Sequence, residues 1–183
     1  MTAHSTQSDT ALAAPGALWR FACTCYGAPG VAGACLAAQE SLDADVCELL
    51  WLAWLYRLGL TAADDAPRAL APVRALQARH TRPLRARRRA LKPLARPGSP
   101  LEAWREYLKR AELEAEHATL DALQALARRG DGVRARRAED GDLVAIFQHH
   151  LETPATSAES FLMPLARALE HAATRPVLPP RGE

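Results

Sequence analysis

The sequence predicts an all-α protein, a compact multi-helix domain, from three observations. Hydrophobic residues make up 49% of the 183 positions and aromatic residues only 5%, because the apolar surplus is largely alanine, the strongest intrinsic helix former. β-Branched residues are scarce, which disfavours a sheet. Apolar residues also recur at helical spacing between Gly and Pro breaks. The length suits one domain with its own core.

The domain is expected to span residues 15–172. Residues 1–14 are small and polar and are expected to form a disordered N-terminus, and 173–183 a Pro-rich disordered tail. The first helices are expected at 17–26 and 31–40, separated by the break "GAPG". A third helix at 44–58 carries large apolar residues on nearly every face, as a central helix surrounded by others does.

The middle of the chain predicts short helices followed by one long helix. Prolines 67, 72, 83 and 93 divide the basic region into short helical pieces. At "SPLE", Ser99, Pro100 and Glu102 form a capping box that begins a long helix over 100–127. Apolar residues at heptad-like spacing are expected to pack closely on a neighbouring helix. They are Leu101, Trp104, Leu108, Ala111, Ala115, Ala118, Ala122 and Ala125. Residues 128–142 are expected to be an exposed loop, with further helices at 142–151 and 155–173.

The four cysteines indicate a reducing environment. Cys23, Cys25, Cys35 and Cys47 lie in apolar segments, as reduced core cysteines do. No basic region followed by an apolar stretch marks a secretory signal. The most apolar run, 46–60, contains two charged residues and is shorter than the ~20 residues of a membrane span. We therefore expect a cytoplasmic protein that does not contact a membrane.

No motif specifies a reaction. Glu114-x-x-His117 is similar to half of a di-iron ligand set, but no second such pair exists in the chain. Cys23 and Cys25 point in nearly opposite directions on a helix and cannot ligate one zinc together. We therefore predict no catalytic residue, no metal and no cofactor, and we favour a non-enzymatic protein.

Two charged residues in apolar helices form a candidate polar core pair. Arg20 and Glu48 should each find a partner, because a buried unpaired charge is costly. We expect them to pair with one another. The alternative is a pocket among Trp19, Trp51 and Trp54 that binds a small anion through Arg20.

Two blocks of residues resemble a known family. The first block contains Trp19, Arg20, Phe21, Tyr26, Pro29, Gly30, Val31, Cys35, Leu36, Gln39, Asp45, Leu49, Leu50, Trp54 and Gly59. The second contains Pro83, Leu84, Arg85, Arg88, Arg89, Leu91, Lys92 and "ELEAE" at 112–116. With them the chain resembles small conserved proteobacterial proteins of unknown function. The resemblance implies an all-helical cytoplasmic protein and supplies no reaction, cofactor or partner.

A basic stripe is the main candidate site. Arg82, Arg85, Arg89, Lys92 and Arg96 recur at spacings of three and four on the helix expected over 82–96. Ten basic residues and no acid lie between 66 and 101, whereas the following helix is rich in glutamate. The two helices could pair internally, yet the acids are too few to neutralise every cation.

We therefore predict an interaction module that contacts an acidic protein partner through the stripe. One alternative is RNA or DNA binding by the same arginines, which the net charge of only +2 disfavours. A further alternative is a small-molecule binding protein or enzyme with a pocket near Arg20 and Glu48.

Overall fold

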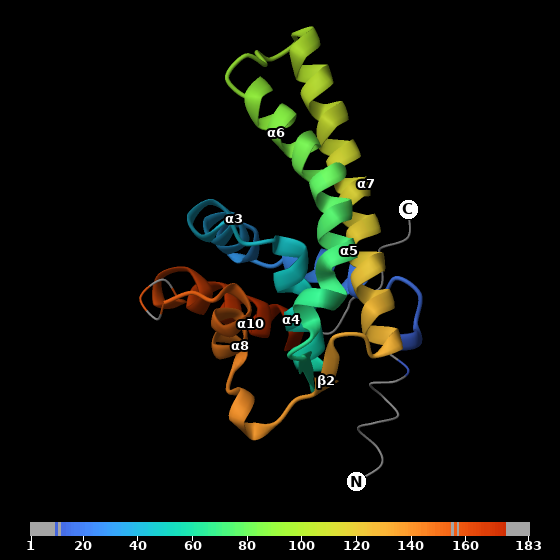
Figure 1. The fold of residues 1–183 in the computed structure, drawn as a ribbon. Coiled ribbons are helices and arrows are strands. Elements are labelled where there is room, and N and C mark those ends of the chain that lie inside the picture. Colours follow the sequence, from blue (N-terminus) through green and yellow to red (C-terminus); the bar gives the residue numbers. More distant parts are fainter. Residues whose placement is uncertain (1–9, 11, 155, 157, 175–183) are drawn as a thin grey trace.

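The computed structural model describes residues 10, 12–154, 156 and 158–174, and it confirms the predicted all-α fold. Its helices are α2 (Ala17–Tyr26), α3 (Val31–Leu42), α4 (Val46–Arg57), α5 (Ala66–Arg79), α6 (Thr81–Leu91), α7 (Pro100–Arg129), α8 (Leu143–Leu151) and α10 (Met163–Thr174). A π-helical turn, Ala158–Leu162, leads into α10, and a 3-10 turn, Ala138–Asp140, precedes α8. Most helices pack into one body, from which α6 and part of α7 project (Figure 1).

Helix α4 is the centre of the body, as predicted. Every residue from Cys47 to Leu55 is buried, because α2, α3, α7, α8 and α10 pack around it (Figure 1). Asp45 caps the helix, since its Oδ1 accepts a hydrogen bond from the Glu48 backbone N–H at 3.0 Å. A helix buried on all sides must be apolar on all sides, which is the pattern that the sequence displays here.

A small sheet replaces part of the predicted loop. β1 (Leu60–Ala62) pairs antiparallel with β2 (Val133–Ala135), with Thr61 opposite Arg134. The expectation of a loop over 128–142 is therefore wrong at β2. These three-residue strands contain no alternating apolar pattern long enough to predict a strand.

Helix α7 begins where its cap predicts. Ser99 Oγ accepts from the Glu102 backbone N–H at 3.3 Å, and Glu102 Oε2 accepts from the Gly98 N–H at 2.6 Å. The Glu102 side chain thus accepts from the backbone N–H of the residue before the N-cap, whereas in a standard capping box it accepts from the N–H of the N-cap itself. The helix ends at Gly130, whose left-handed φ of 72° suits glycine.

The predicted heptad seam is not the face that α7 buries. Its buried residues are Glu112, Thr119, Leu120, Leu123, Gln124, Leu126 and Ala127. None of them belongs to the seam, which is partly or fully exposed along its length. Leu101, Trp104 and Ala118 are exposed, whereas Ala122 packs against the core, so the expected close packing along the seam is only partial.

The predicted disordered ends fall largely outside the described residues. Residues 1–9, 11 and 175–183 are among those not described. Residues 10, 12 and 13 are helical, and Leu12 packs against the core. Gln124 Nε2 donates to the carbonyls of Leu12 and Ala14, at 3.2 and 2.7 Å. The described part of 1–14 is thus bound to α7, contrary to expectation.

None of the described helices is by itself both long enough and apolar enough to cross a membrane. Only α2 and α3 taken together meet that test, and the chain bends by 99° between them.

Candidate interaction surface

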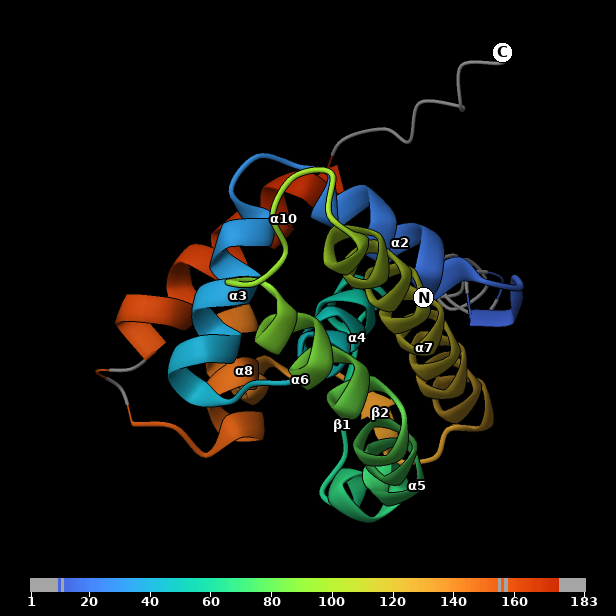
Figure 2. The same cartoon turned by 90° about the horizontal axis from the view of Figure 1, so that it is seen from above.

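An antiparallel helical hairpin projects from the body. It consists of α6, the connection 92–99 and the first half of α7, and we call residues 81–116 the arm. Helices α6 and α7 lie side by side in both views (Figures 1 and 2). The arm contains ten arginine and lysine residues against five glutamates, a net charge of +5. The arm is thus far more positive than the whole chain, which carries +2.

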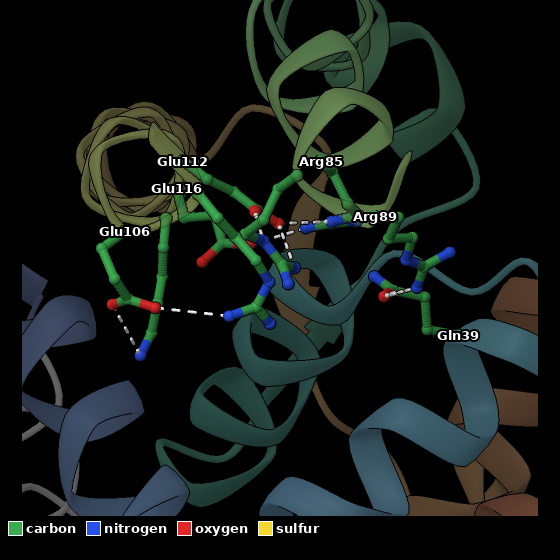
Figure 3. Close-up of polar contacts among 9 residues, drawn as sticks. Gln39, Arg85, Arg89, Glu106, Glu112 and Glu116 are labelled. Carbon is green, nitrogen blue, oxygen red and sulfur yellow. Dashed lines mark hydrogen bonds and ion pairs between the residues drawn. The ribbon is translucent and has the colours of Figure 1, made fainter. Parts of the chain in front are cut away.

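A buried charge cluster binds the two helices of the arm together (Figure 3). Arg85 Nε donates to Glu112 Oε1 at 2.8 Å, and Arg85 Nη2 donates to Glu116 Oε1 at 2.6 Å. Arg88 donates to the same Glu112 carboxylate. Glu112 is only 5% exposed, so its carboxylate is shielded from water, while the other three side chains are partly buried. Two arginines of the basic run therefore form ion pairs inside the arm.

The two glutamates of this cluster respond differently to burial. Burial raises the pKa of each, but the hydrogen bonds from Arg88 and Arg85 outweigh it at Glu112 and lower its pKa. At Glu116 burial prevails over the attraction of Arg85 alone, so its pKa lies above the ordinary value. Glu112 is therefore the stronger anchor for the arginines.

The predicted basic stripe is divided by this arrangement. Arg85 points inward and is not displayed, which corrects that member of the stripe. Arg89 is exposed and donates to Gln39 Oε1 of α3 at 2.9 Å (Figure 3). The remaining three, Arg82, Lys92 and Arg96, are exposed and form no ion pair with any described residue. The helix expected over 82–96 ends at Leu91, so Lys92 and Arg96 lie in the connection 92–99 and not on α6. Four of the five cations are thus at the surface, but they do not form one stripe on a single helix.

Sequence reasoning missed further exposed residues of the arm. Arg87 and Arg110 are exposed cations that likewise have no acidic partner among the described residues. Trp104 and Tyr107 are 59% and 58% exposed and lie edge to face, with ring centroids 5.9 Å apart. Leu94 and Leu101 are also exposed. Trp104 was expected to pack on a neighbouring helix, but it is exposed, since heptad spacing does not reveal which helix occupies the seam.

The predicted pair of Arg20 and Glu48 does not form. Arg20 is exposed and donates from Nη1 to the Pro15 carbonyl at 2.7 Å. Glu48 instead accepts two hydrogen bonds from Arg74 of α5, at 2.8 and 2.7 Å. His150 Nε2 of α8 lies 2.7 Å from Glu48 Oε2. The expectation that Glu48 is paired holds, but its partners come from helices far along the chain.

The Glu48 cluster joins three helices through one buried carboxylate. Burial alone would raise the pKa of Glu48, but the hydrogen bonds with Arg74 and His150 outweigh it and lower the pKa to about 2. The carboxylate is therefore ionised and structural. Its described partners are Arg74 and His150, and Arg20 instead donates to the Pro15 carbonyl.

Three of the four cysteines, and His117 of the candidate metal pair, pack against other residues of the chain. Cys25, Cys35 and Cys47 are buried, and burial raises the pKa of the Cys25 thiol to about 11. Cys23, however, is exposed, which corrects its expected place in the core. His117 stacks on Trp19 with ring centroids 4.2 Å apart. No group of metal-ligating side chains that could hold an ion occurs within the described part of the chain.

A cavity of about 400 Å³ lies between α2, α4, α8 and α10. Its lining residues are Phe21, Ala53, Tyr56, Arg57, Leu143, Leu169 and Glu170. Neither Arg20 nor Glu48 lines it, so the predicted pocket near those two residues is not the cavity found.

The family model described as "Protein of unknown function (DUF2390)" matches residues 17–123. The chain belongs to this family. The match covers more than half of the sequence and includes the whole arm, and it confirms the resemblance to an uncharacterised conserved family. The family description supplies no reaction or partner. No curated protein and no solved structure matches the chain.

Proposed function

We propose that the protein is a non-enzymatic interaction module and that its arm contacts an acidic protein partner. The observation that carries the proposal is the set of exposed arm cations whose side chains form neither an ion pair nor a hydrogen bond with a described residue. They are Arg82, Arg87, Lys92, Arg96 and Arg110. Such charges increase the rate and specificity of association with a surface of opposite sign. We also propose a cytoplasmic location, because all four cysteines are free thiols, as is usual in a reducing compartment.

The composition of the arm surface supports a protein partner. Trp, Tyr and Arg are the residue types that most often dominate binding energy at protein interfaces. Here Trp104 and Tyr107 lie on the same arm as the unpaired arginines. The buried cluster of Arg85 with Glu112 and Glu116 holds α6 against α7, so the surface is formed before binding.

Binding of RNA or DNA is the second candidate. It is supported by the same exposed aromatic rings, since bases stack on Trp and Tyr beside cations. A whole-chain charge of +2 ranks it below the acidic protein, because nucleic-acid affinity depends on many phosphate contacts.

Affinity purification with a charge-reversal variant tests the proposal. The full chain is purified from its native cell with and without nuclease, beside the double variant Arg82→Glu/Arg96→Glu. The control, Arg68→Glu/Arg128→Glu, makes the same change in charge at exposed positions outside the arm. We expect capture of an acidic protein to fall at least tenfold in the arm variant and to persist in the control, with nuclease having no effect.

Three results would contradict the acidic-protein proposal. Loss of every partner on nuclease treatment assigns the arm to nucleic acid. Equal losses in the arm variant and the control show that overall charge, rather than the arm, governs capture. Full capture by the arm variant shows that the exposed cations do not bind the partner. Thermal melting of both variants confirms that each remains folded.

A further inference from the structure

The cavity in the body of the protein lies outside the arm and has no part in the function proposed above. Helices α2, α8 and α10 each pack against α4, and the cavity of about 400 Å³ is lined by residues from all four helices. Small-molecule sites in proteins are clefts of this order of size, and many of them lie between the helices of a helical domain. The volume is thus sufficient for a small ligand.

The walls of the cavity are mainly apolar and are held in place by the core. Ala53, Leu143 and Leu169 are at most 4% exposed, so packing fixes their positions. Tyr56 adds an aromatic wall, and the guanidinium of Arg136 lies over its ring, 4.4 Å from the centroid. The cavity is therefore formed before a ligand binds, which lowers the entropic cost of binding.

Two charged residues of opposite sign also line the cavity. Arg57 lies at the end of α4 and Glu170 lies on α10, and both are exposed. A guanidinium has five N–H donors, so Arg57 can bind the carboxylate of a ligand in addition to its contacts within the chain. The cavity thus combines apolar walls with one cation and one anion.

We propose that this cavity binds a free α-amino acid with an apolar side chain. The carboxylate of the ligand binds Arg57, its ammonium group binds Glu170, and its side chain lies against the apolar walls. Charge complementarity selects this class of ligand. A purely anionic ligand would meet the like charge of Glu170, and a purely cationic ligand would meet that of Arg57, whereas a zwitterion finds an opposite charge for each of its own.

Calorimetric titration of the full chain tests the class of ligand. The probes are L-leucine and two analogues with the same carbon skeleton: 4-methylpentanoate lacks the ammonium group, and 3-methylbutylamine lacks the carboxylate. L-Aspartate tests the need for an apolar side chain. We expect L-leucine to bind, and each of the other three to bind at least about tenfold more weakly. Absence of binding by both L-leucine and L-phenylalanine would overturn the inference, as would equal affinities for L-leucine and any of the three.

Two variants at exposed positions assign the charges of the cavity. Arg57→Gln should weaken binding of L-leucine but not of 3-methylbutylamine, because this analogue lacks the carboxylate that Arg57 binds. Glu170→Gln should weaken binding of L-leucine but not of 4-methylpentanoate, for the corresponding reason. Arg68→Gln and Glu40→Gln make the same changes at exposed positions that do not line the cavity. Loss of L-leucine binding in these controls, or normal binding in both cavity variants, would refute the assignment.

A blocking variant locates the ligand within the cavity. Ala53→Leu enlarges a wall residue and leaves both charges in place, so it should abolish binding of L-leucine. Normal binding would show that the ligand lies elsewhere. Thermal melting shows whether each variant is folded, and if Ala53→Leu is not, the two glutamine variants decide the question. The arm variant Arg82→Glu/Arg96→Glu should bind L-leucine normally, so failure of this inference is distinct from failure of the proposed function.

Discussion

Arg85 Nη2 lies 2.6 Å from Glu116 Oε1, while Arg85 Nε binds Glu112 on the turn before, so one guanidinium spans two turns of α7 (Figure 3). The basic helix and the acidic helix therefore do pair internally at this point. Only Arg85 and Arg88 join α6 to α7 in this way, whereas Arg82, Lys92 and Arg96 remain exposed. Internal pairing and external display thus coexist in the arm: Arg85 and Arg88 of α6 bind α7, whereas exposed cations lie both on α6 and in the connection 92–99.

Replacement of Arg85 is expected to destabilise the fold, unlike replacement of its exposed neighbour. Arg85→Met leaves Glu116 without a cation and removes one of two arginines from Glu112, a loss of about 2–4 kcal/mol. Arg89→Met breaks only an exposed hydrogen bond to Gln39 and should cost less than about 0.5 kcal/mol. Urea unfolding of both variants measures the difference. Equal free energies of unfolding would show that the buried cluster does not stabilise the arm.

The Glu48 cluster is expected to make stability depend on pH below about 5. The pKa of the Glu48 carboxyl is lowered from an ordinary 4.5 to about 2, so the folded state holds the carboxyl proton less tightly than the unfolded chain does. The resulting stabilisation is fully present above about pH 4.5 and is lost as the pH falls towards 2. A shift of this size corresponds to about 3 kcal/mol.

Glu48→Gln tests this pH dependence. The variant cannot ionise, so it should be about 3 kcal/mol less stable than the wild type at pH 6. The difference should shrink steadily between pH 4.5 and 2. Glu40→Gln, at an exposed position of α3, is the matched control and should follow the wild type throughout. A difference for Glu48→Gln that does not change with pH would contradict the structural role of the charge.

The sequence predicted the parts of the fold that depend on local patterns. Helix α4 was expected at 44–58 and lies at Val46–Arg57, because an all-apolar helix has few other places in a globular protein. The start of α7 was expected at Pro100 because the cap, the proline and the glutamate all act within one turn. These features need no knowledge of distant residues.

The candidate site was predicted only in part, because it depends on long-range pairing. The cations of the arm were visible in the sequence, but Arg85 faces α7 only because α6 folds back on it. Glu48 binds His150, 102 positions away, and no local pattern relates the two. The heptad-spaced residues of α7 were expected to pack on a neighbouring helix, because this spacing shows that a helix can pack there without showing which helix does.

Thiol labelling should distinguish one cysteine from the other three. Cys23 is exposed, so a thiol reagent should modify it in the native protein, although partial burial raises its pKa and slows the reaction. Cys25, Cys35 and Cys47 are buried and should react only after unfolding. Mass spectrometry of the labelled protein should therefore show one modification before denaturation and four afterwards. Loss of the native label in Cys23→Ser identifies the site.

Removal of buried side-chain atoms from the central helix should lower the free energy of unfolding. Leu52 is 1% exposed within α4, so Leu52→Ala removes buried methyl groups and leaves a cavity, a loss of about 2–5 kcal/mol. Leu36→Ala, at an exposed position of α3, removes the same atoms from a solvated site and should change stability by less than about 0.5 kcal/mol. Chemical unfolding of the two variants compares them, and an unchanged midpoint for Leu52→Ala would contradict the central position of α4.

Substitutions at the two glycines after α7 distinguish the cost of backbone strain from the cost of steric overlap. Gly130 and Gly132 have similar left-handed φ angles, 72° and 65°, so alanine at either position adds strain of about 1 kcal/mol. A Cβ at Gly130 would meet nothing within 4 Å, whereas one at Gly132 would lie 2.9 Å from Ala66 Cα and 2.8 Å from Ala69 Cβ.

Gly132→Ala must therefore push α5 away from the connection between α7 and β2. This connection carries the hydrogen bond from the Ala63 N–H to the Gly132 carbonyl, at 2.9 Å. We expect Gly130→Ala to lower the free energy of unfolding by about 1 kcal/mol and Gly132→Ala by about 2–4 kcal/mol, because overpacking adds to the strain. Urea titrations of the two variants under one set of conditions give the comparison. Equal losses would mean that α5 does not lie against Gly132 in solution.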